Sequence, residues 1–474
     1  MKYKVCLLLA MLCLANFSYG QLKYEWGDKF DFDPKTELEP TFILKDNYNH
    51  FLLTVFNGNT DKPKVILRKF DQKNQLVQTF THDFPAFDIS TLHNYLGFAE
   101  SDQGRVAVFT ETYSGKAKKS SIYKHEFDKA TAKFVSTEII SNPILSLGKS
   151  GTVSLEKSGN QNFIGINYTI HQSKDEPEKN LMLVLDANTF NVVWQKEFVF
   201  TDKYITSNFT VTNSGKVVFV RIAKGFKLHN YLVLASSQAQ EEKRLETEIF
   251  LQQPKAISIG SQEYIVAFNY PAKGVSINRG DYSNLLLYDL SSGKTIQNAK
   301  ISEFNTLRNI TDIHIQKITI QDNEIQIFTE AEIKTEIKPG TPAVSLASLG
   351  NSYTFGPSNL IITSLDGTVK TIAKLSVDEK SRGELYHSFG LININGTYHL
   401  NTGNYNSFYS LDAAKNYQKS DTGQISFTSG DPLRSQNIKF VNQLVEYFPA
   451  GKRFLFARII NDREMSLVSV FGLK

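Results

Sequence analysis

The residues that could perform chemistry are scattered along this chain and form none of the common catalytic motifs. Nine histidines occur, but none stands in His-x-His or His-Glu-x-x-His, the spacings that place two imidazoles on one metal ion. There is no Gly-x-Ser-x-Gly elbow, and the nearest thing to a phosphate loop, Gly293-Lys294-Thr295, has Tyr288 where an earlier glycine belongs. The sequence therefore predicts no metal and no cofactor, although a site assembled from distant segments stays open.

Carboxylates are the remaining candidates for catalysis. Glycoside hydrolysis uses two of them about 5–10 Å apart, and they could come from well-separated parts of the chain. Glu330, Glu332 and Glu336 cluster after one expected strand. We interpret this cluster as a solvated strand end.

The first 20 residues have the pattern of a secretory signal. A basic head of Lys2 and Lys4 precedes an apolar run, and Ser18 and Gly20 are small residues at a cleavage position before Gln21. The chain is expected to be exported to the periplasm or beyond the cell. The alternative is a lipoprotein anchored through Cys13, but the preceding position is Leu12 and a small residue is expected there.

Charge and cysteine content exclude several classes of function. The net charge is +4, and it falls to +2 without Lys2 and Lys4, so no broad basic surface for nucleic acid is expected. The two cysteines, Cys6 and Cys13, both lie in the leader, so the mature chain should contain no disulfide or thiolate ligand. No later run is long and apolar enough to span a membrane.

A repeat is the strongest organising signal. The stretch Asn284–Thr295 indicates a strand, a tight polar turn and a returning strand, and seven other places resemble it. Each belongs to a unit of four short strands, and the third strand of each unit starts near residue 64, 121, 181, 231, 285, 360, 407 or 466. Antiparallel units of this period are typical of a β-propeller.

We therefore predict an all-β, eight-bladed β-propeller of four-stranded antiparallel blades, built as a single domain by residues 21–474. The last unit has only three strands, and Tyr24–Phe32 alternates large aromatic residues without a neighbouring partner. We expect this N-terminal strand to complete the last blade and close the ring. Seven blades are the alternative, because the fourth and sixth units are the least regular. We expect the fourth strand at Thr247–Leu251 in the fourth unit and at Gln424–Thr428 in the seventh.

The architecture resembles the β-propeller superfamily over nearly the whole mature chain. In the third unit, Leu185–Trp194 is similar to a pyrroloquinoline-quinone-type repeat, which has Asp, then Thr-Gly, then Trp at this spacing. Phe190 stands where the glycine belongs, and the match covers one unit in eight. The resemblance therefore implies the fold and no quinone cofactor.

Long loops provide the candidate binding site. The connection from the second to the third strand is the longer one in most units, and equivalent connections in antiparallel sheets leave from the same edge. These loops carry the candidate ligand-binding residues Tyr113, Lys116, Lys118, Lys119, Lys224, Lys227, Lys273, Arg279, Tyr282, Lys338, Tyr353 and Phe355. The sequence favours a non-enzymatic propeller that binds a protein or glycan partner, with a preference for anionic groups. The alternatives are a polysaccharide-acting hydrolase or lyase with carboxylates in the central channel, and a purely structural role in the envelope.

Overall fold

The stretch with the clearest repeat forms the expected hairpin. In the computed structural model, β21 (Asn284–Asp289) pairs with β22 (Lys294–Lys300). The Asp289 carboxylate accepts hydrogen bonds from Ser291 N at 2.8 Å and Ser291 Oγ at 2.7 Å, and Gly293 takes a left-handed φ of 69°. Only a turn of this handedness brings the chain back in register, which explains the glycine.

The same aspartate-anchored turn recurs between the third and fourth strands of other sheets. Asp186 accepts backbone hydrogen bonds from Asn188 and Thr189, and the buried Phe190 takes a φ of 56° where Gly293 stands in its own turn. Asp128 binds the following amides in the same way, and Ala132 has a φ of 57°. The repeat in the sequence is thus a repeat of this turn.

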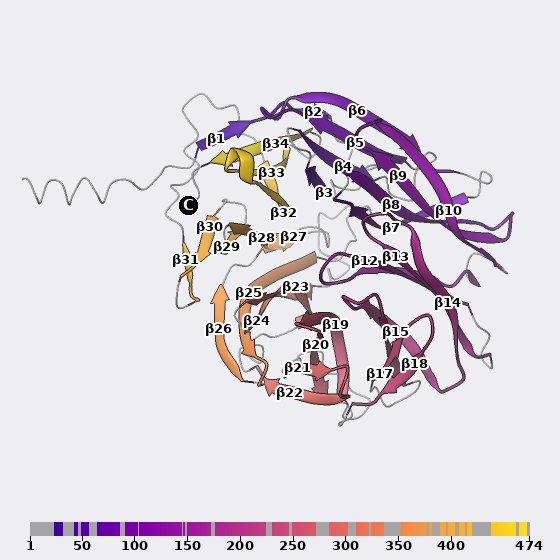
Figure 1. Ribbon diagram of the computed structural model, residues 1–474. Helices are drawn as coiled ribbons and strands as arrows, with labels where there is room; N and C mark the ends of the chain where they lie inside the picture. Colours follow the sequence, from indigo (N-terminus) through magenta and orange to yellow (C-terminus); the bar gives the residue numbers. More distant parts are fainter. Residues whose placement is uncertain are drawn as a thin grey trace, which may run out of the picture. The chain divides into compact units, whose positions relative to one another are not determined.

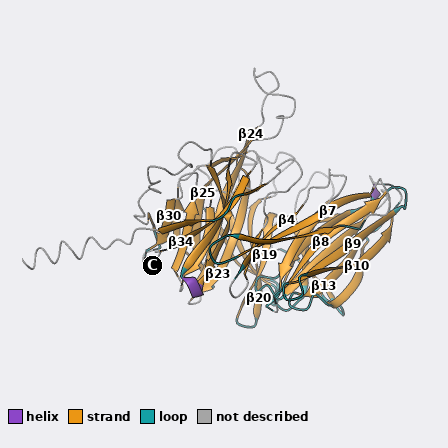
Figure 2. Cartoon of the chain, turned by 90° about the horizontal axis from the view of Figure 1, so that it is seen from above, coloured by secondary structure: helices purple, strands orange, loops and turns teal. Residues whose placement is uncertain are grey.

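The structure describes residues 23–31, 42–45, 49–55, 64–85, 91–102, 104–144, 146, 149–171, 176–223, 230–245, 249–271, 284–301, 310–321, 324–335, 352–366, 368–375, 379–381, 389–394, 397–402, 407–412, 415–419, 438–460 and 464–471. Residues 1–22, which include both cysteines, lie outside these residues. Within them, strands form eight antiparallel sheets, and no helix is long and apolar enough to cross a membrane (Figures 1 and 2). The chain is therefore an all-β, eight-bladed β-propeller, as predicted, and not the seven-bladed alternative.

Two compact units make up the chain. The first contains Met1–Thr54, Ile66–Phe80 and Ala373–Lys474, and the second contains Val55–Val65 and Thr81–Ile372. Three sheets belong wholly or mostly to the first unit. Their strands are β3 (Phe42–Lys45), β4 (His50–Val55), β5 (Lys64–Phe70) and β6 (Leu76–Asp83); β28 (Phe389–Ile394), β29 (Thr397–Thr402), β30 (Ser407–Leu411) and β31 (Tyr417–Lys419); and β32 (Ile438–Phe448), β33 (Arg453–Ile460) and β34 (Glu464–Phe471) with β1 (Lys23–Trp26) and β2 (Phe30–Asp31). A short 3-10 turn, η5 (Pro449–Gly451), joins β32 to β33.

Five sheets belong wholly or mostly to the second unit. Their strands are β7 (Thr91–Glu100), β8 (Arg105–Ser114), β9 (Lys119–Asp128) and β10 (Lys133–Pro143); β11 (Thr152–Lys157), β12 (Phe163–Ile170), β13 (Glu178–Asp186) and β14 (Val192–Phe200); β15 (Tyr204–Val211), β16 (Val217–Ala223), β17 (Asn230–Ala235) and β18 (Gln240–Lys243); β19 (Ile249–Ile259), β20 (Gln262–Pro271), β21 and β22; and β23 (Ile310–Gln321), β24 (Glu324–Thr335), β25 (Ser352–Ser364) and β26 (Val369–Leu375). The short strand β27 (Glu379–Ser381) belongs to the first unit.

Two of the expected fourth strands were misplaced. The fourth strand of the fourth sheet is β18 at Gln240–Lys243, and Ile249 already begins the first strand of the next sheet. We had placed it at Thr247–Leu251, but the polar residues 240–243 form it, because an edge strand exposed to water needs no apolar face. In the seventh sheet the fourth strand is β31 at Tyr417–Lys419, whereas the expected Gln424–Thr428 lies outside the described residues.

Burial explains why each sheet needs a neighbour. The second and third strands are buried along almost their whole length, as in β8 and β21, whereas the fourth strand β14 is largely exposed. Within the second unit, each apolar cluster joins two consecutive sheets: Phe109 and Ile122 pack with Ile166 and Leu183, and a second cluster joins Met182 to Phe219. A sheet apolar on both faces is stable only when both faces are covered.

The N-terminal strand completes the last sheet, as predicted. Residues 23–26 pair with 468–471 of β34, and Phe30 and Asp31 pair with Met465 and Glu464. Between the two short strands, Gly27 N donates to Leu467 O at 2.8 Å, and Asn74 of the β5–β6 turn donates to Ser469 Oγ at 2.9 Å. Within the first unit, the segment thus ties the last sheet to the first.

Gly27 should be intolerant of a side chain. A Cβ there would clash with the Cβ of Asn74 and lie 2.9 Å from Leu467 O. Gly27→Ala should lower the free energy of unfolding by on the order of 1–3 kcal/mol in a urea titration. Gly451→Ala is the matched control, because its nearest added contact is 3.4 Å from the flexible Arg453 side chain and little change is expected. Equal stability of the two variants would show that the N-terminal segment is not held this tightly.

Buried histidines should make the fold acid-sensitive. Burial, with a smaller contribution from Arg453, lowers the pKa of His50 to about 3. Burial also lowers the pKa of His125 to about 3, with His82 and His93 adding to the effect. Between pH 6.5 and 3 the unfolded chain binds these protons and the folded chain does not, so stability falls as the pH drops below 6.5. By pH 5 each group should remove up to about 2 kcal/mol.

Urea unfolding at pH 7.5 and pH 5 measures this effect. The loss of stability between the two pH values should be smaller in His125→Asn than in the wild type. An unchanged loss would mean that His125 already carries a proton in the folded protein.

Candidate functional site

The first strands of the second unit lie next to one another. β7 contacts β11, β11 contacts β15, β15 contacts β19, and β19 contacts β23. Each first strand pairs on one edge only, with the second strand of its own sheet. Bulges interrupt β15, β19 and β23, and Gln253 at the β19 bulge has a φ of 42°. A bulge bends its strand and turns side chains away from the regular alternation, which is common beside binding sites.

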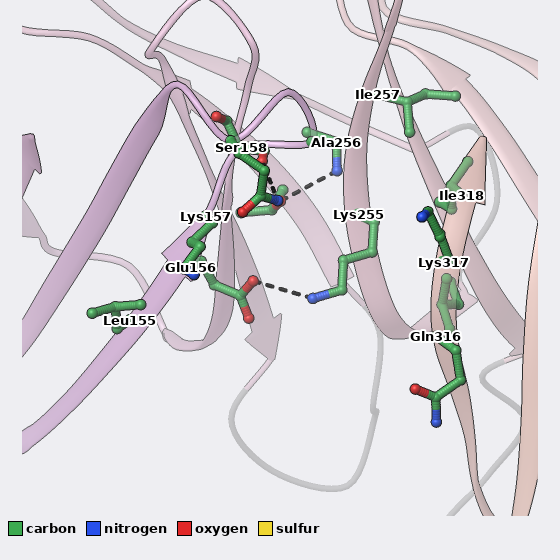
Figure 3. Close-up of a pocket in the computed structure, with 14 residues that line it drawn as sticks. Leu155, Glu156, Lys157, Ser158, Lys255, Ala256, Ile257, Gln316, Lys317 and Ile318 are labelled. Carbon is green, nitrogen blue, oxygen red and sulfur yellow. Dashed lines mark hydrogen bonds and ion pairs between the residues drawn. The ribbon is translucent and has the colours of Figure 1, made fainter. Parts of the chain in front are cut away.

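Four of these first strands line a pocket of about 760 Å³ (Figure 3). Its walls come from β11, β15, β19 and β23 and from the short turn that follows β11. The lining residues are Leu155, Glu156, Lys157, Ser158, Gly159, Gln161, Thr210, Lys255, Ala256, Ile257, Ile315, Gln316, Lys317 and Ile318. Three lysines and a single carboxylate are among them.

An ion pair spans the pocket. Lys255 Nζ of β19 lies 3.1 Å from Glu156 Oε2 of β11, and the two side chains are 37% and 25% exposed (Figure 3). Strand β15 lies between these two strands in the chain, so the pair joins sheets that are not consecutive. Ion pairs with this exposure are weak, because water competes for both charges.

Lys157 has a different environment. Side chains alternate along β11, so Lys157 points to the face opposite Glu156. Its ammonium lies 4.2 Å from the centre of the Phe98 ring of β7, a cation–π contact. Burial lowers the pKa of Lys157 to about 8, opposed by the charge of Glu100. It is therefore largely protonated at neutral pH, but it is directed between two sheets.

Polar groups are available around the pair. Thr210 Oγ1 accepts a hydrogen bond from Ala256 N at 3.2 Å, which leaves its hydroxyl proton free to be donated. Gln316 Nε2 donates to Glu330 Oε2 at 3.1 Å, and Gln161 Nε2 donates to Ser158 O at 3.2 Å. In both glutamines the amide nitrogen is held by the protein, so the amide oxygen can be offered to a ligand.

A chain of hydrogen bonds from β19 to β24 fixes the tautomer of His314, which lies in β23. Gln253 Oε1 accepts from Ile315 N at 3.3 Å, so its Nε2 is the atom that donates to His314 Nδ1 at 3.0 Å. The proton of the imidazole is then on Nε2, 2.7 Å from Glu332 Oε2. Both ring nitrogens are occupied, so this histidine positions neighbouring strands and offers no free base.

The interpretation of the glutamate cluster as a solvated strand end was wrong. Glu330 is fully buried on β24, and Glu332 is partly buried against His314. We expected these glutamates to be exposed because the sequence pattern does not show which residues of β23 face them. In the structure, Gln316 bonds to Glu330 and His314 bonds to Glu332. Glu336 lies outside the described residues.

Most of the predicted ligand-binding residues are not tested. Lys116 and Lys118 are exposed on the β8–β9 turn, where the strands run to Ser114 and from Lys119 and leave a shorter connection than expected. Lys119 lies in β9 and pairs with Glu138 at 2.8 Å. Tyr113 lies in β8, and Tyr353 and Phe355 lie in β25. The others, Lys224, Lys227, Lys273, Arg279, Tyr282 and Lys338, lie outside the described residues.

The pocket lies at the opposite end of the strands from the β8–β9 turn that carries Lys116 and Lys118. It includes Ser158, Gly159 and Gln161 of the turn between first and second strands, whereas the predicted residues follow second strands. The sequence analysis did not predict this pocket, because it located the binding site from the lengths of the loops. The available signal was charge within the first strands, at Glu156, Lys255 and Lys317. In the part of the chain that the structure describes, no three His, Cys, Asp or Glu side chains are grouped to hold a metal ion.

No protein-family model and no curated protein matches the chain. Among solved structures, it is similar to the β-propeller domain of the Trilobed protease from Pyrococcus furiosus, with 13% identity, a TM-score of 0.38, and coverage of 80% of this chain and 97% of that one. The Dos1 propeller shares 9% identity over 94% of this chain and 95% of its own, with a TM-score of 0.43. The acylaminoacyl peptidase of Pyrococcus horikoshii shares 10% identity over 88% of this chain and 57% of its own, with a TM-score of 0.37.

The ion pair across the pocket should be measurable as a coupling. Urea unfolding of Glu156→Gln, Lys255→Gln and the double variant forms a double-mutant cycle, and the expected interaction is about 0.2–1 kcal/mol at low salt. It should shrink as salt is added, because both side chains reach water. A coupling of zero at low salt would mean that the two side chains do not meet in solution.

Proposed function

We propose that this β-propeller is an exported, non-enzymatic binding protein whose pocket holds an acidic group of a glycan. The observation that carries the proposal is a concave site lined by Lys255 and Lys317, with Glu156 as the one carboxylate among its described lining residues. A volume of about 760 Å³ falls in the range of about 300–1,000 Å³ that is typical of small-molecule sites. One or two sugar residues would fit such a space.

The lining has the chemistry of a saccharide site. Lys255 and Lys317 can pair with a carboxylate, sulfate or phosphate on the sugar. The Thr210 hydroxyl and the Gln316 amide oxygen can bond sugar hydroxyls, one as donor and the other as acceptor. Ile315 and Ile318, which are partly buried, offer aliphatic surface to the C–H face of a ring.

A glycan fits the pocket better than a protein partner does. A stable protein interface buries about 800 Å² on each side, and it needs a broad complementary surface. The sequence-based expectation of a protein or glycan on the long-loop face stays a prediction, since most of its residues lie outside the described part of the chain.

The lining gives less support to a polysaccharide-cleaving enzyme. Hydrolysis of a glycosidic bond generally requires an acid and a second carboxylate. Glu156 is the one carboxylate among the lining residues, and it is already paired with Lys255. Export to the periplasm or the outside is part of the proposal, and its support is the basic and apolar leader at residues 1–20.

Removing the pocket cations should weaken binding of acidic sugars. The probe is trigalacturonic acid, measured by isothermal titration calorimetry against Lys255→Gln combined with Lys317→Gln. Affinity should fall at least about tenfold, because each lost charged hydrogen bond is worth roughly 1.5 kcal/mol or more. The dependence of affinity on salt should also become shallower.

The matched control is Lys116→Gln combined with Lys118→Gln, which removes the same charge from the β8–β9 turn. This variant should bind like the wild type. If it loses affinity while the pocket variant does not, the ligand binds at the loops that the sequence favoured.

A further inference from the structure

Lys255 in the pocket already forms an ion pair with a carboxylate of the protein, that of Glu156. Lys255 Nζ meets Glu156 Oε2 at 3.1 Å although the residues are 99 positions apart in the chain. Among the described residues, neither side chain has another ion-pair partner. Figure 3 shows the two side chains reaching toward each other from separate strands.

We propose that Glu156 is an internal competitor for ligand, which the acid group of the bound glycan displaces from Lys255. The inference rests on the proposed function, because it concerns the same pocket and deepens its specificity. In the free protein the Glu156 carboxylate stands where the carboxylate, sulfate or phosphate of the ligand would bind. An acidic ligand replaces one anion by another at Lys255, so the lysine is paired before and after binding.

The exposure of the pair makes this exchange feasible. Glu156 is 25% exposed, so its carboxylate can rotate into water and remain solvated after displacement. Lys157 lies on the other face of β11 against Phe98, so it does not hold Glu156 in place from behind. A neutral sugar has no charge with which to replace Glu156. The pair therefore lowers the affinity for acidic glycans, each of which must displace Glu156, and leaves the affinity for neutral glycans unaffected.

The test compares Glu156→Gln with the wild type. The ligands are trigalacturonic acid and its fully methyl-esterified form, which has the same shape without the charges. Glu156→Gln should bind the acid about fivefold more tightly, because the competing carboxylate and its repulsion are gone. Binding of the methyl ester should not change. In a Lys255→Gln background, Glu156→Gln should raise the affinity for the acid by less than it does in the wild-type background. The reason is that the lysine for which the two anions compete is then absent.

Glu138→Gln is the matched control. Glu138 pairs with Lys119 at 2.8 Å, with side-chain exposures of 31% and 33%, away from the pocket lining. This variant should leave both affinities unchanged. Melting temperatures of all the variants show that the fold is kept.

Each possible result of these titrations either supports or overturns the inference. Weaker acid binding by Glu156→Gln would mean that Glu156 contacts the sugar directly and would overturn the inference while leaving the proposed function intact. Unchanged acid binding would also overturn the inference alone. Binding of the acid by Glu156→Gln but not by the wild type would support both. If no variant binds it, the proposed function and the inference both fail.

Discussion

The architecture depends on one constraint: each four-stranded sheet is apolar on both faces and must be covered on both. Strands such as β8 and β21 have almost no exposed residue, so a sheet standing alone would expose an apolar surface to water. Within the second unit, each neighbour covers one face, and the apolar clusters bridge consecutive sheets. The first strands pair on one edge only and carry the charged residues Glu156, Lys255 and Lys317 that line the pocket.

Much of this could be predicted from the sequence because the repeat depends on a local turn. An aspartate that binds its own following amides, with a left-handed residue four positions later, leaves a pattern in the sequence at Asp289 and Gly293. The pattern weakens where the chain accepts a costly conformation, as at Phe190, whose buried ring offsets its positive φ. It fails where a polar edge strand such as β18 needs no pattern at all.

The pocket could not be predicted in the same way. Its walls come from strands roughly 50 residues apart or more, and no local spacing relates Glu156 to Lys255. Charges inside first strands were visible in the sequence, but which of them face a common space depends on bulges and on the stacking of sheets. Loop length is readable from the sequence, and for that reason it was given too much weight. The contacts of Glu330 and His314 illustrate the same limit, because a polar residue in a strand is exposed or buried according to its neighbour.

The joining of the N-terminal segment to β34 has a consequence for how the chain reaches its native state. Lys29 and Glu464 form an ion pair across a sequence separation of 435 residues. The sheet that they join cannot be finished during synthesis until β34, which ends at Phe471, has emerged. Pairings of such long range form slowly, because a large loop must close first. Until then β34 has an open edge, so a newly made chain should depend on chaperones that shield this strand until the N-terminal segment pairs with it.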